Sequence, residues 1–184
     1  FDHVQFGYDD NLLMKDVNIS VQPGQMVALV GPTGAGKTTL MNLLLRFYDV
    51  KGGSIKIDGV DIRDMKREDL RSLFSLVLQD TWLFNGTIYD NLRYGRLNAR
   101  KDEVIEAAKT ANIHHYIRTL SHGYDTMINE EGNNISQGEK QLLTIARAIL
   151  KDPQILILDE ATSSVDTRLE KMLQEAMTRV MQNR

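Results

Sequence analysis

The sequence contains no cysteine, and this absence excludes several kinds of site. Without cysteine there is no disulfide framework, no thiolate nucleophile and no cysteine-ligated metal. Long apolar runs are missing too, because none approaches the ~18 residues that a membrane-spanning helix requires. The N-terminus shows neither the charged nor the apolar region of a signal peptide. We therefore expect a soluble chain, and the missing cysteines favour a reducing compartment.

An excess of positive charge is also absent. The chain has 22 lysines and arginines against 25 aspartates and glutamates, a formal net charge of −3. No global positive field therefore attracts nucleic acid or anionic lipid. We expect no nucleic-acid partner, and any polyanionic ligand must be held by a local arrangement of donors.

The chain of 184 residues suits one compact domain, which at this size buries roughly 70% of the surface that its unfolded form exposes. Phe1 is not a start methionine and lies within a strand-like pattern. Arg184 closes a helical pattern without a stop signal. We expect the chain to be an excerpt, cut at its C-terminal end, from a longer polypeptide.

Two kinds of strand pattern are present. Apolar and polar residues alternate in the opening third, which predicts half-buried antiparallel strands. The alternating apolar residues are Val4, Phe6 and Tyr8, then Val17, Ile19 and Val21, then Ile55 and Ile57. Three other apolar runs, at 26–30, 75–78 and 155–158, do not alternate. They are typical of parallel strands that helices cover on both faces.

Helical spacing of apolar residues follows several of these strands. It is found at Leu40, Leu43, Leu44 and Phe47, at Val104, Ala108 and Ala111, at Leu142, Ile145, Ala146 and Ile149, and at Leu169, Met172, Leu173, Ala176 and Val180. Strands mixed with crossover helices predict an α/β fold with a mixed, mainly parallel core sheet. We assign residues 1–80 and 151–184 to this core with its antiparallel β subdomain, and residues 81–150 to a helical lobe.

A glycine-rich loop joins the apolar run at 26–30 to the first helical pattern. Its sequence, from Gly31 to Thr38, fits the phosphate-binding template G-x-x-x-x-G-K-[ST] of P-loop NTPases in the required strand-to-helix context. Glycines let the backbone N–H groups point inward to a phosphate, Lys37 supplies a positive charge and Thr38 offers a hydroxyl to Mg²⁺. The predicted nucleotide contacts are Gly31, Thr33, Gly34, Ala35, Gly36, Lys37, Thr38 and Thr39. The alternative, a glycine-rich turn with a surface lysine, requires strand, spacing, lysine and hydroxyl to coincide by chance.

Acidic and amide side chains follow the other two apolar runs. Asp159 and Glu160 come directly after the run at 155–158. Asp159 is placed to hold Mg²⁺, and Glu160 to orient or deprotonate an attacking water. Gln79 follows the run at 75–78 and could ligate Mg²⁺ and sense the same water. A strand-end turn capped by acids, and an ordinary polar stop at Gln79, are the alternatives.

A second candidate phosphate site precedes the helix predicted from Glu139 to Leu150. Ser136 and Glu139 have the spacing of a capping box, which is a sufficient structural reason for both. A capped helix that exposes a serine hydroxyl and the Gly138 amide is also suited to bind an anion. Both roles are compatible.

Taken together, these motifs make the chain resemble the nucleotide-binding domain of ATP-binding cassette transporters, most similar to exporter-type subunits. The resemblance covers essentially the whole chain. The matching motifs are Walker A at 31–38, the Q-loop at Gln79, the signature at 135–139, Walker B at 155–160 and the D-loop at Ser163 to Asp166. It implies a transport-coupled ATPase that uses ATP and Mg²⁺, with catalytic roles for Glu160, Lys37 and Gln79.

The resemblance also implies partners. In this family two domains sandwich two ATP molecules, so Ser136, Gly138, Glu139 and Asp166 are expected to face nucleotide on a second domain. Tyr8 occupies the position of an aromatic residue that stacks on adenine; its alternative is an ordinary strand-end tyrosine. The segments 83–88 and 91–95 resemble the part that faces the coupling helices of the membrane domain, on the cytoplasmic face of a membrane. Trp82 and Phe84 are the interface candidates, with core packing as the alternative.

Two features depart from the family pattern. The usual signature is Leu-Ser-Gly-Gly-Gln, whereas this chain has Gln137 and Glu139 at the third and fifth positions. The added bulk and negative charge would weaken this half of the sandwich, which favours a heterodimer. Glu130 falls near the exporter cross-talk loop, but the match is imperfect. The family's switch histidine would lie beyond Arg184, so we expect the excerpt to bind MgATP weakly and to hydrolyse it slowly.

Other functions fit the same motifs less well. A chromosome-maintenance ATPase needs a long coiled-coil insertion between Walker A and the signature, for which the interval from Lys37 to Ser136 leaves no room. A non-hydrolysing nucleotide switch would not need Glu160. A translation factor of the same superfamily would carry two such cassettes in one chain, and this alternative stays open.

Overall fold

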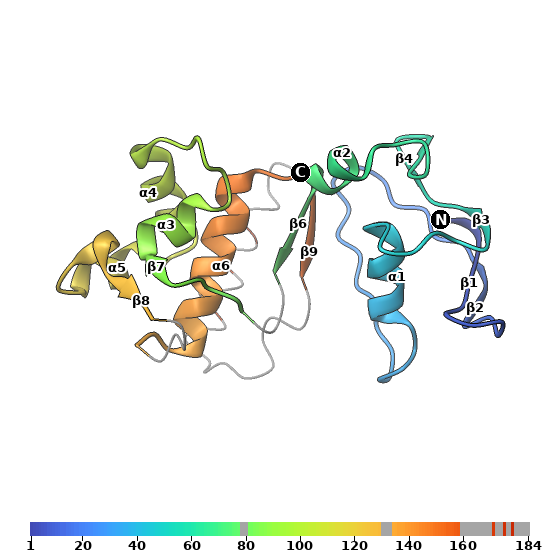
Figure 1. Ribbon diagram of the computed structural model, residues 1–184, viewed down its shortest axis with the longest axis horizontal. Helices are drawn as coiled ribbons and strands as arrows, with labels where there is room; N and C mark the ends of the chain where they lie inside the picture. The colour runs from blue at the N-terminus through green and yellow to red at the C-terminus, as the bar shows by residue number, and fades with distance from the viewer. Residues whose placement is uncertain (78–80, 130–133, 159–170, 172–174, 176–177, 179–184) are drawn as a thin grey trace. The chain divides into compact units, whose positions relative to one another are not determined.

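The structure is a computed structural model, and it describes residues 1–77, 81–129, 134–158, 171, 175 and 178. The chain divides into two compact units, Phe1–Leu73 and Phe74–Arg184 (Figure 1). The first unit contains the glycine-rich loop. The second contains the helices predicted for the helical lobe.

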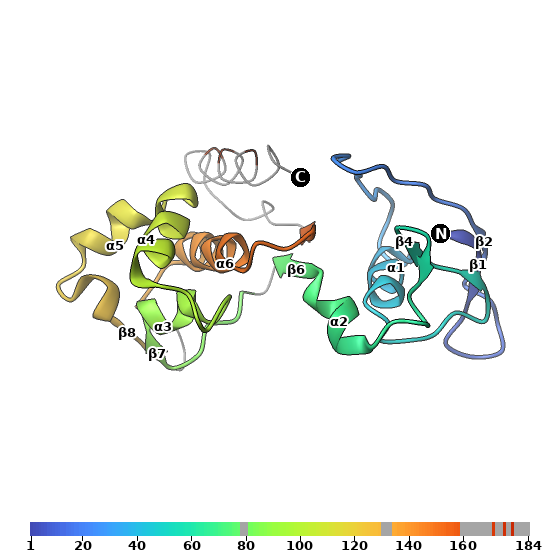
Figure 2. The same cartoon turned by 90° about the horizontal axis from the view of Figure 1, so that it is seen from above.

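A small antiparallel sheet forms one side of the first unit. It consists of β1 (Asp2–Phe6), β2 (Met14–Val17) and β3 (Gly52–Ser54), in the order β2-β1-β3. A separate hairpin pairs β4 (Lys56–Ile57) with β5 (Val60–Asp61). The helices are α1 (Lys37–Leu44), which lies beside the sheet in both views, and α2 (Arg67–Ser72) (Figures 1 and 2). The antiparallel strands predicted for the opening third are thus confirmed, although they are shorter than the alternation suggests.

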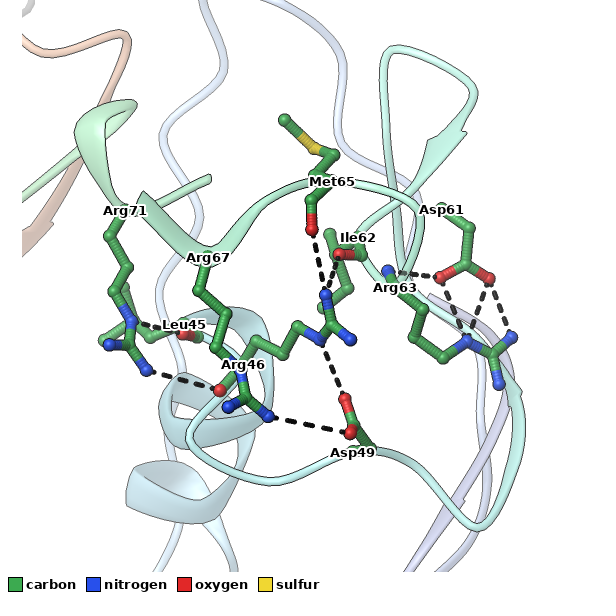
Figure 3. Close-up of polar contacts among 9 residues, drawn as sticks. All are labelled: Leu45, Arg46, Asp49, Asp61, Ile62, Arg63, Met65, Arg67 and Arg71. Carbon is green, nitrogen blue, oxygen red and sulfur yellow. Dashed lines mark hydrogen bonds and ion pairs between the residues drawn. The ribbon is translucent and has the colours of Figure 1, made fainter. Parts of the chain in front are cut away.

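Arginine side chains close the C-terminal end of α1 (Figure 3). Arg71, on α2, donates hydrogen bonds to the carbonyl oxygens of Leu45 (3.2 Å) and Arg46 (3.4 Å). The Arg46 guanidinium donates to the carbonyl oxygens of Ile62 and Met65, both at 3.0 Å. Cations at a helix C-terminus complement its negative dipole end. These bonds fix α1, and with it the glycine loop at the opposite end of the helix, to the rest of the unit.

Parallel strands are found in the second unit. Strand β6 (Phe74–Val77) pairs in parallel with β9 (Ile155–Leu158), and Phe74 lies opposite Ile155. The prediction that these two apolar runs form parallel strands is therefore confirmed. A short antiparallel pair, β7 (Gly86–Thr87) and β8 (Met127–Ile128), lies between the helices of the lobe.

Helix α6 (Gln137–Lys151) is the centre of the second unit. It contacts α3 (Ile88–Arg93), α4 (Lys101–Thr110) and β6, and α5 (His114–Thr119) contacts α4 (Figures 1 and 2). The fully buried side chains of this unit include Ile88, Leu92, Val104, Ile113, Ile117, Ile128, Leu142 and Leu143. Among the described residues, no helix combines the length and apolar character needed to cross a membrane.

Two local predictions are wrong. The run at 26–30 is not a strand in the structure, and Val27 and Val30 are 49% and 89% exposed. A buried strand needs backbone partners on its edges, and no described strand pairs with this run. Phe47 does not continue the first helix, because α1 ends at Leu44 and Arg46 adopts a positive φ of 53°. The Phe47 side chain is 55% exposed.

Candidate nucleotide-binding site

The glycine loop has the backbone conformation that its sequence predicts. Gly34 and Gly36 have φ values of 84° and 93°, a region that residues with a Cβ rarely adopt. Gly36 is the N-cap of α1, and no side chain caps this helix. A Cβ on Gly36 would also lie 3.1 Å from the Met14 side chain. The first N–H groups of α1 therefore have no side-chain partner and are suited to a bound anion.

Lys37 folds back over this loop. Its ammonium group donates hydrogen bonds to the carbonyl oxygens of Gly31 (2.5 Å) and Pro32 (3.0 Å). An ammonium has three N–H donors, so these two bonds hold the charge at the loop and leave a further donor. Thr38, the next residue, is exposed, and its hydroxyl is in a position to be reached by a ligand or metal from solvent. Thr33, Gly34 and Ala35 are exposed as well.

Tyr8 lies next to the start of α1. Its hydroxyl shares a hydrogen bond of 3.0 Å with the hydroxyl of Thr39, which is only 6% exposed. The Tyr8 ring packs edge-on against Phe6 and Tyr48, with centroids 5.2 Å away in both cases. Tyr8 is still 59% exposed, so a face of its ring remains open for a planar group. The structure thus brings Tyr8 to the glycine loop across 31 positions of sequence.

Open space adjoins the loop on the side of β2. A hollow of about 620 Å³ is bordered by Ala35, Gly36 and Lys37, and by residues 13–17 and 28–30. This volume is in the range of small-molecule sites. Away from the loop, the charged side chains of Lys15 and Asp16 border this space beside apolar residues.

The signature residues lie together at the N-terminus of α6. Ser136 is the N-cap, and its backbone N–H and its hydroxyl both donate to one carboxylate oxygen of Glu139, at 2.9 and 2.6 Å. The predicted capping box is therefore confirmed. Gly138 is buried in the first turn. Burial raises the pKa of Tyr116 to about 12, and the negative charge of Glu139 and a hydrogen bond to it act in the same direction.

Three aromatic side chains gather at the two ends of α3, on the segment before it and on the residue that follows it. Trp82, Phe84 and Tyr94 form a triangle with centroid separations of 6.0, 6.3 and 5.7 Å, which we call the aromatic cluster. Trp82 and Tyr94 are 61% and 55% exposed. The alternative of core packing is therefore wrong for Trp82, whereas Phe84 is half-buried.

Two residues that support this cluster were not predicted from sequence. Asn91 is 1% exposed, and Arg147 lies on α6 against it. The one available signal was a cation between the apolar residues Ala146 and Ala148 of a helix that is otherwise buried on that side. Their partners come from 56 positions away, which no local pattern reveals.

Several predicted site residues lie outside the described residues: Gln79, Glu130, Asp159, Glu160 and Asp166. Their roles in holding Mg²⁺ and activating water stay predictions. Among the residues that the structure does describe, no group of three or more histidine or acidic side chains could hold a metal ion. The described donors of the first unit, namely loop amides, an ammonium and a hydroxyl, are those that bind a phosphate.

A comparison with known protein families identifies the chain at this point. The family model described as "ABC transporter" matches residues 14–163. The chain belongs to the ABC transporter family. The matched range includes the glycine loop, the aromatic cluster and the start of α6.

Individual members of the ABC transporter family are similar over the entire chain. A fatty acid ABC transporter ATP-binding/permease protein of Mycobacterium tuberculosis is 54% identical over 185 residues, which cover 100% of this chain and 29% of that protein. An ATP-dependent lipid A-core flippase of Syntrophus aciditrophicus is 50% identical over 182 residues, which cover 99% of this chain and 30% of that protein.

A solved ABC structure confirms the predicted fold. The structure of a bacterial Atm1-family ABC exporter with ATP bound matches with a TM-score of 0.92 and 46% sequence identity, over 100% of this chain and 32% of that one. The α/β fold of a P-loop NTPase is therefore shown. The chain spans about a third of the length of the relatives it matches.

Proposed function

We propose that this domain binds and hydrolyses ATP and so powers the export of a substrate across a membrane. The observation that carries the proposal is the glycine loop, where the left-handed Gly36 opens α1 and Lys37 lies on the loop carbonyls. Positive charge and uncapped N–H groups converge there on the space that a phosphate would fill. The relatives that are named a transporter, a flippase and an exporter support transport as the use of this energy.

Different residues are proposed to bind the phosphates, to hold Mg²⁺ and to activate the attacking water. The loop amides and Lys37 would bind the β- and γ-phosphates, and the Thr38 hydroxyl, with Asp159 and Gln79, would hold Mg²⁺. When bound, Mg²⁺ neutralises phosphate charge as a Lewis acid. Glu160 would orient the attacking water and accept its proton.

Tyr8 is proposed to hold the adenine ring, and a pair of variants tests this. We expect Tyr8→Ala to weaken ATP binding about five- to tenfold, because stacking of aromatic rings is worth about 1 kcal/mol. Tyr8→Phe keeps the ring and loses the hydrogen bond to Thr39, so its affinity should stay close to that of the native protein. Titration with a fluorescent ATP analogue measures both. If Tyr8→Ala and Tyr8→Phe bind ATP with equal affinity, Tyr8 does not stack on the adenine ring.

The proposed partners are a second nucleotide-binding domain and the coupling helices of a membrane domain. Exposed aromatic side chains are common at protein interfaces, and Trp82 and Tyr94 present such a surface. We propose that the aromatic cluster contacts the coupling helices, which places the domain at the cytoplasmic face of a membrane. The relative described as an ATP-binding/permease protein supports a membrane domain in the same polypeptide.

The partner domain is proposed to differ from this one, because the Glu139 carboxylate accepts the hydrogen bond of the Ser136 hydroxyl that the signature would offer to a phosphate. The Ser136 hydroxyl donates its proton to the Glu139 carboxylate at 2.6 Å, so a γ-phosphate would have to replace that acceptor. The carboxylate also places a negative charge where an anion would approach. In a heterodimer, this chain's Lys37, Asp159 and Glu160 would serve the competent site and its signature the weaker one.

Replacing Glu139 with glutamine should strengthen this signature. An amide keeps an oxygen for the capping box but removes the charge, so we expect ATP-dependent self-association to improve about three- to tenfold. Sedimentation velocity with and without MgATP measures the change. Glu103→Gln is the matched control, because Glu103 closes the capping box of α4 by accepting from the Arg100 N–H at 2.8 Å. If the two variants behave alike, Glu139 does not weaken the signature.

A further inference from the structure

The guanidinium of Arg147 attaches α6 to the segment that carries the aromatic cluster. Its Nε donates to the carbonyl oxygen of Asn91 (2.8 Å), one terminal nitrogen donates to the carbonyl oxygen of Trp82 (3.1 Å), and the other to the Asn91 side-chain oxygen (2.9 Å). The guanidinium carbon also lies 5.4 Å from the centre of the Tyr94 ring. One side chain of α6 therefore contacts two of the three rings or their backbone.

Asn91 extends this attachment into the loop before α3. Its amide nitrogen donates to the carbonyl oxygens of Phe84 (3.0 Å) and Thr87 (3.1 Å), and its side-chain oxygen accepts from the Phe84 N–H at 3.1 Å. A buried asparagine with all of these bonds fixes the backbone around it. Arg147 fixes the orientation of Asn91, and Asn91 in turn fixes the backbone beneath Phe84.

The chain between α3 and α4 also lies close to this part of α6. A Cβ built on Gly95 would be 2.2 Å from the carbonyl oxygen of Arg147, so only glycine allows this approach. The hydrogen-bond acceptors of the Arg147 guanidinium are neutral carbonyl and amide oxygens, and burial lowers its pKa. Neutral oxygens in a fixed arrangement hold the cation, and the planar fork of arginine suits that arrangement where a lysine ammonium does not.

A second contact joins the other end of α6 to the same segment. The Gln137 amide donates to the Thr81 hydroxyl at 3.3 Å. Gln137 directly follows Ser136, and Thr81 directly precedes Trp82. Both halves of α6 thus contact the stretch that carries the aromatic cluster, and one of these contacts is made by the first helical residue after the signature serine.

We propose that Arg147, assisted by Gln137, is a positioning residue that holds the aromatic cluster and the signature end of α6 as one rigid piece. A displacement of the aromatic cluster then moves α6, and with it Ser136 at the start of that helix. The purpose of this rigidity rests on the proposed function, in which the cluster contacts the membrane domain and Ser136 faces nucleotide. The rigidity itself can be tested without nucleotide.

Trp82 is the only tryptophan of the chain, so its fluorescence reports on the cluster alone. We expect Arg147→Lys to increase the amplitude of fast motion in the time-resolved anisotropy of Trp82 roughly twofold, because an ammonium cannot bridge three oxygens in this geometry. Arg93→Lys is the matched control, since Arg93 makes one side-chain hydrogen bond to the described part of the chain, to the Leu97 carbonyl. Ile117→Val, in the core of the same unit, controls for a general loss of stability.

Distance measurements test whether the two ends move together. The absence of cysteine allows spin labels at Asn85→Cys, beside the cluster, and at Lys140→Cys, near the start of α6. We expect a narrow distance distribution that broadens roughly twofold in Arg147→Lys and further with Gln137→Ala added, but not in Arg93→Lys.

Folded Arg147→Lys protein with native Trp82 anisotropy and an unchanged distance distribution would overturn the proposal. The same holds if Ile117→Val, matched in melting temperature, moves both readouts equally, because the role would then be one of stability only. If Arg147→Lys fails to fold, Gln137→Ala is the deciding variant, because it removes only an exposed contact. An unchanged distance distribution in Gln137→Ala would then contradict the proposal. None of these results depends on ATP binding, so a failure of the nucleotide experiments leaves this test intact.

Discussion

Replacing Lys37 with alanine is expected to weaken ATP binding by about 100-fold. A hydrogen bond to a charged group contributes about 1.5–3 kcal/mol, and each 1.4 kcal/mol changes an affinity tenfold. Lys37 also donates to the Gly31 and Pro32 carbonyl oxygens, so its removal loosens the loop whose N–H groups would surround the phosphates. Titration of the purified protein with labelled ATP, at several protein concentrations, measures the loss.

A second substitution separates charge from packing in this experiment. Lys37→Met keeps the length of the side chain and removes the ammonium, and it should be nearly as damaging as alanine because the electrostatic contacts are lost in both. Lys56→Met is the matched control, since Lys56 forms an exposed ion pair with Asp2 at 3.3 Å. Exposed ion pairs contribute little, so this variant should change the ATP affinity far less than Lys37→Met. Two results would contradict the proposed function. One is an ATP affinity of Lys37→Ala equal to that of the native protein, and the other is a native protein that shows no saturable ATP binding.

The glycine loop could be predicted from sequence because its conformation is decided locally. Gly34 and Gly36 have positive φ values that residues with a Cβ rarely adopt, and Lys37 reaches carbonyls only five and six positions away. The capping box of Ser136 and Glu139 is equally local, since its two residues are three positions apart. Local patterns of this kind fix which side chains meet, before any tertiary contact forms.

The run at 26–30 could not be predicted in the same way. Its apolar composition is that of a buried strand, but a strand forms only where a neighbour accepts and donates its backbone hydrogen bonds. The runs at 75–78 and 155–158 have such a neighbour in each other, which composition alone did not reveal. The register that places Phe74 opposite Ile155 is a property of the pair and not of either run.

The support of the aromatic cluster was missed for a related reason. Trp82 and Phe84 stand out in sequence, whereas Asn91 and Arg147 are ordinary polar residues until the fold places them together. Their roles depend on α3 packing along α6, a contact between segments about 56 positions apart. The exposed aromatic residues could therefore be predicted from sequence, whereas Asn91 and Arg147, which support them, could not.

Glu160→Gln should slow ATP hydrolysis roughly a thousandfold while leaving ATP binding almost unchanged. Glu160 is the second residue after β9 and lies outside the described residues, so this expectation comes from its position after the strand and from the family resemblance. A glutamine has nearly the same shape but cannot accept a proton from water, and general-base catalysis contributes about 10²–10⁴-fold. The measurement is phosphate release together with retention of labelled ATP after rapid gel filtration.

The same variant separates an ATPase from a nucleotide switch that only binds. In an ATPase the glutamine variant retains ATP and accumulates as a closed dimer, because the step that reopens the dimer is blocked. In a switch without hydrolysis, native protein and variant would show the same slow phosphate release and the same dimer fraction. Glu106→Gln is the control, since Glu106 is exposed on α4 and paired only with Lys109 among its described contacts. Lys37→Ala should weaken ATP binding, whereas Glu160→Gln should leave it almost unchanged and slow only hydrolysis. If both variants lose ATP binding and hydrolysis, circular dichroism shows whether they are folded.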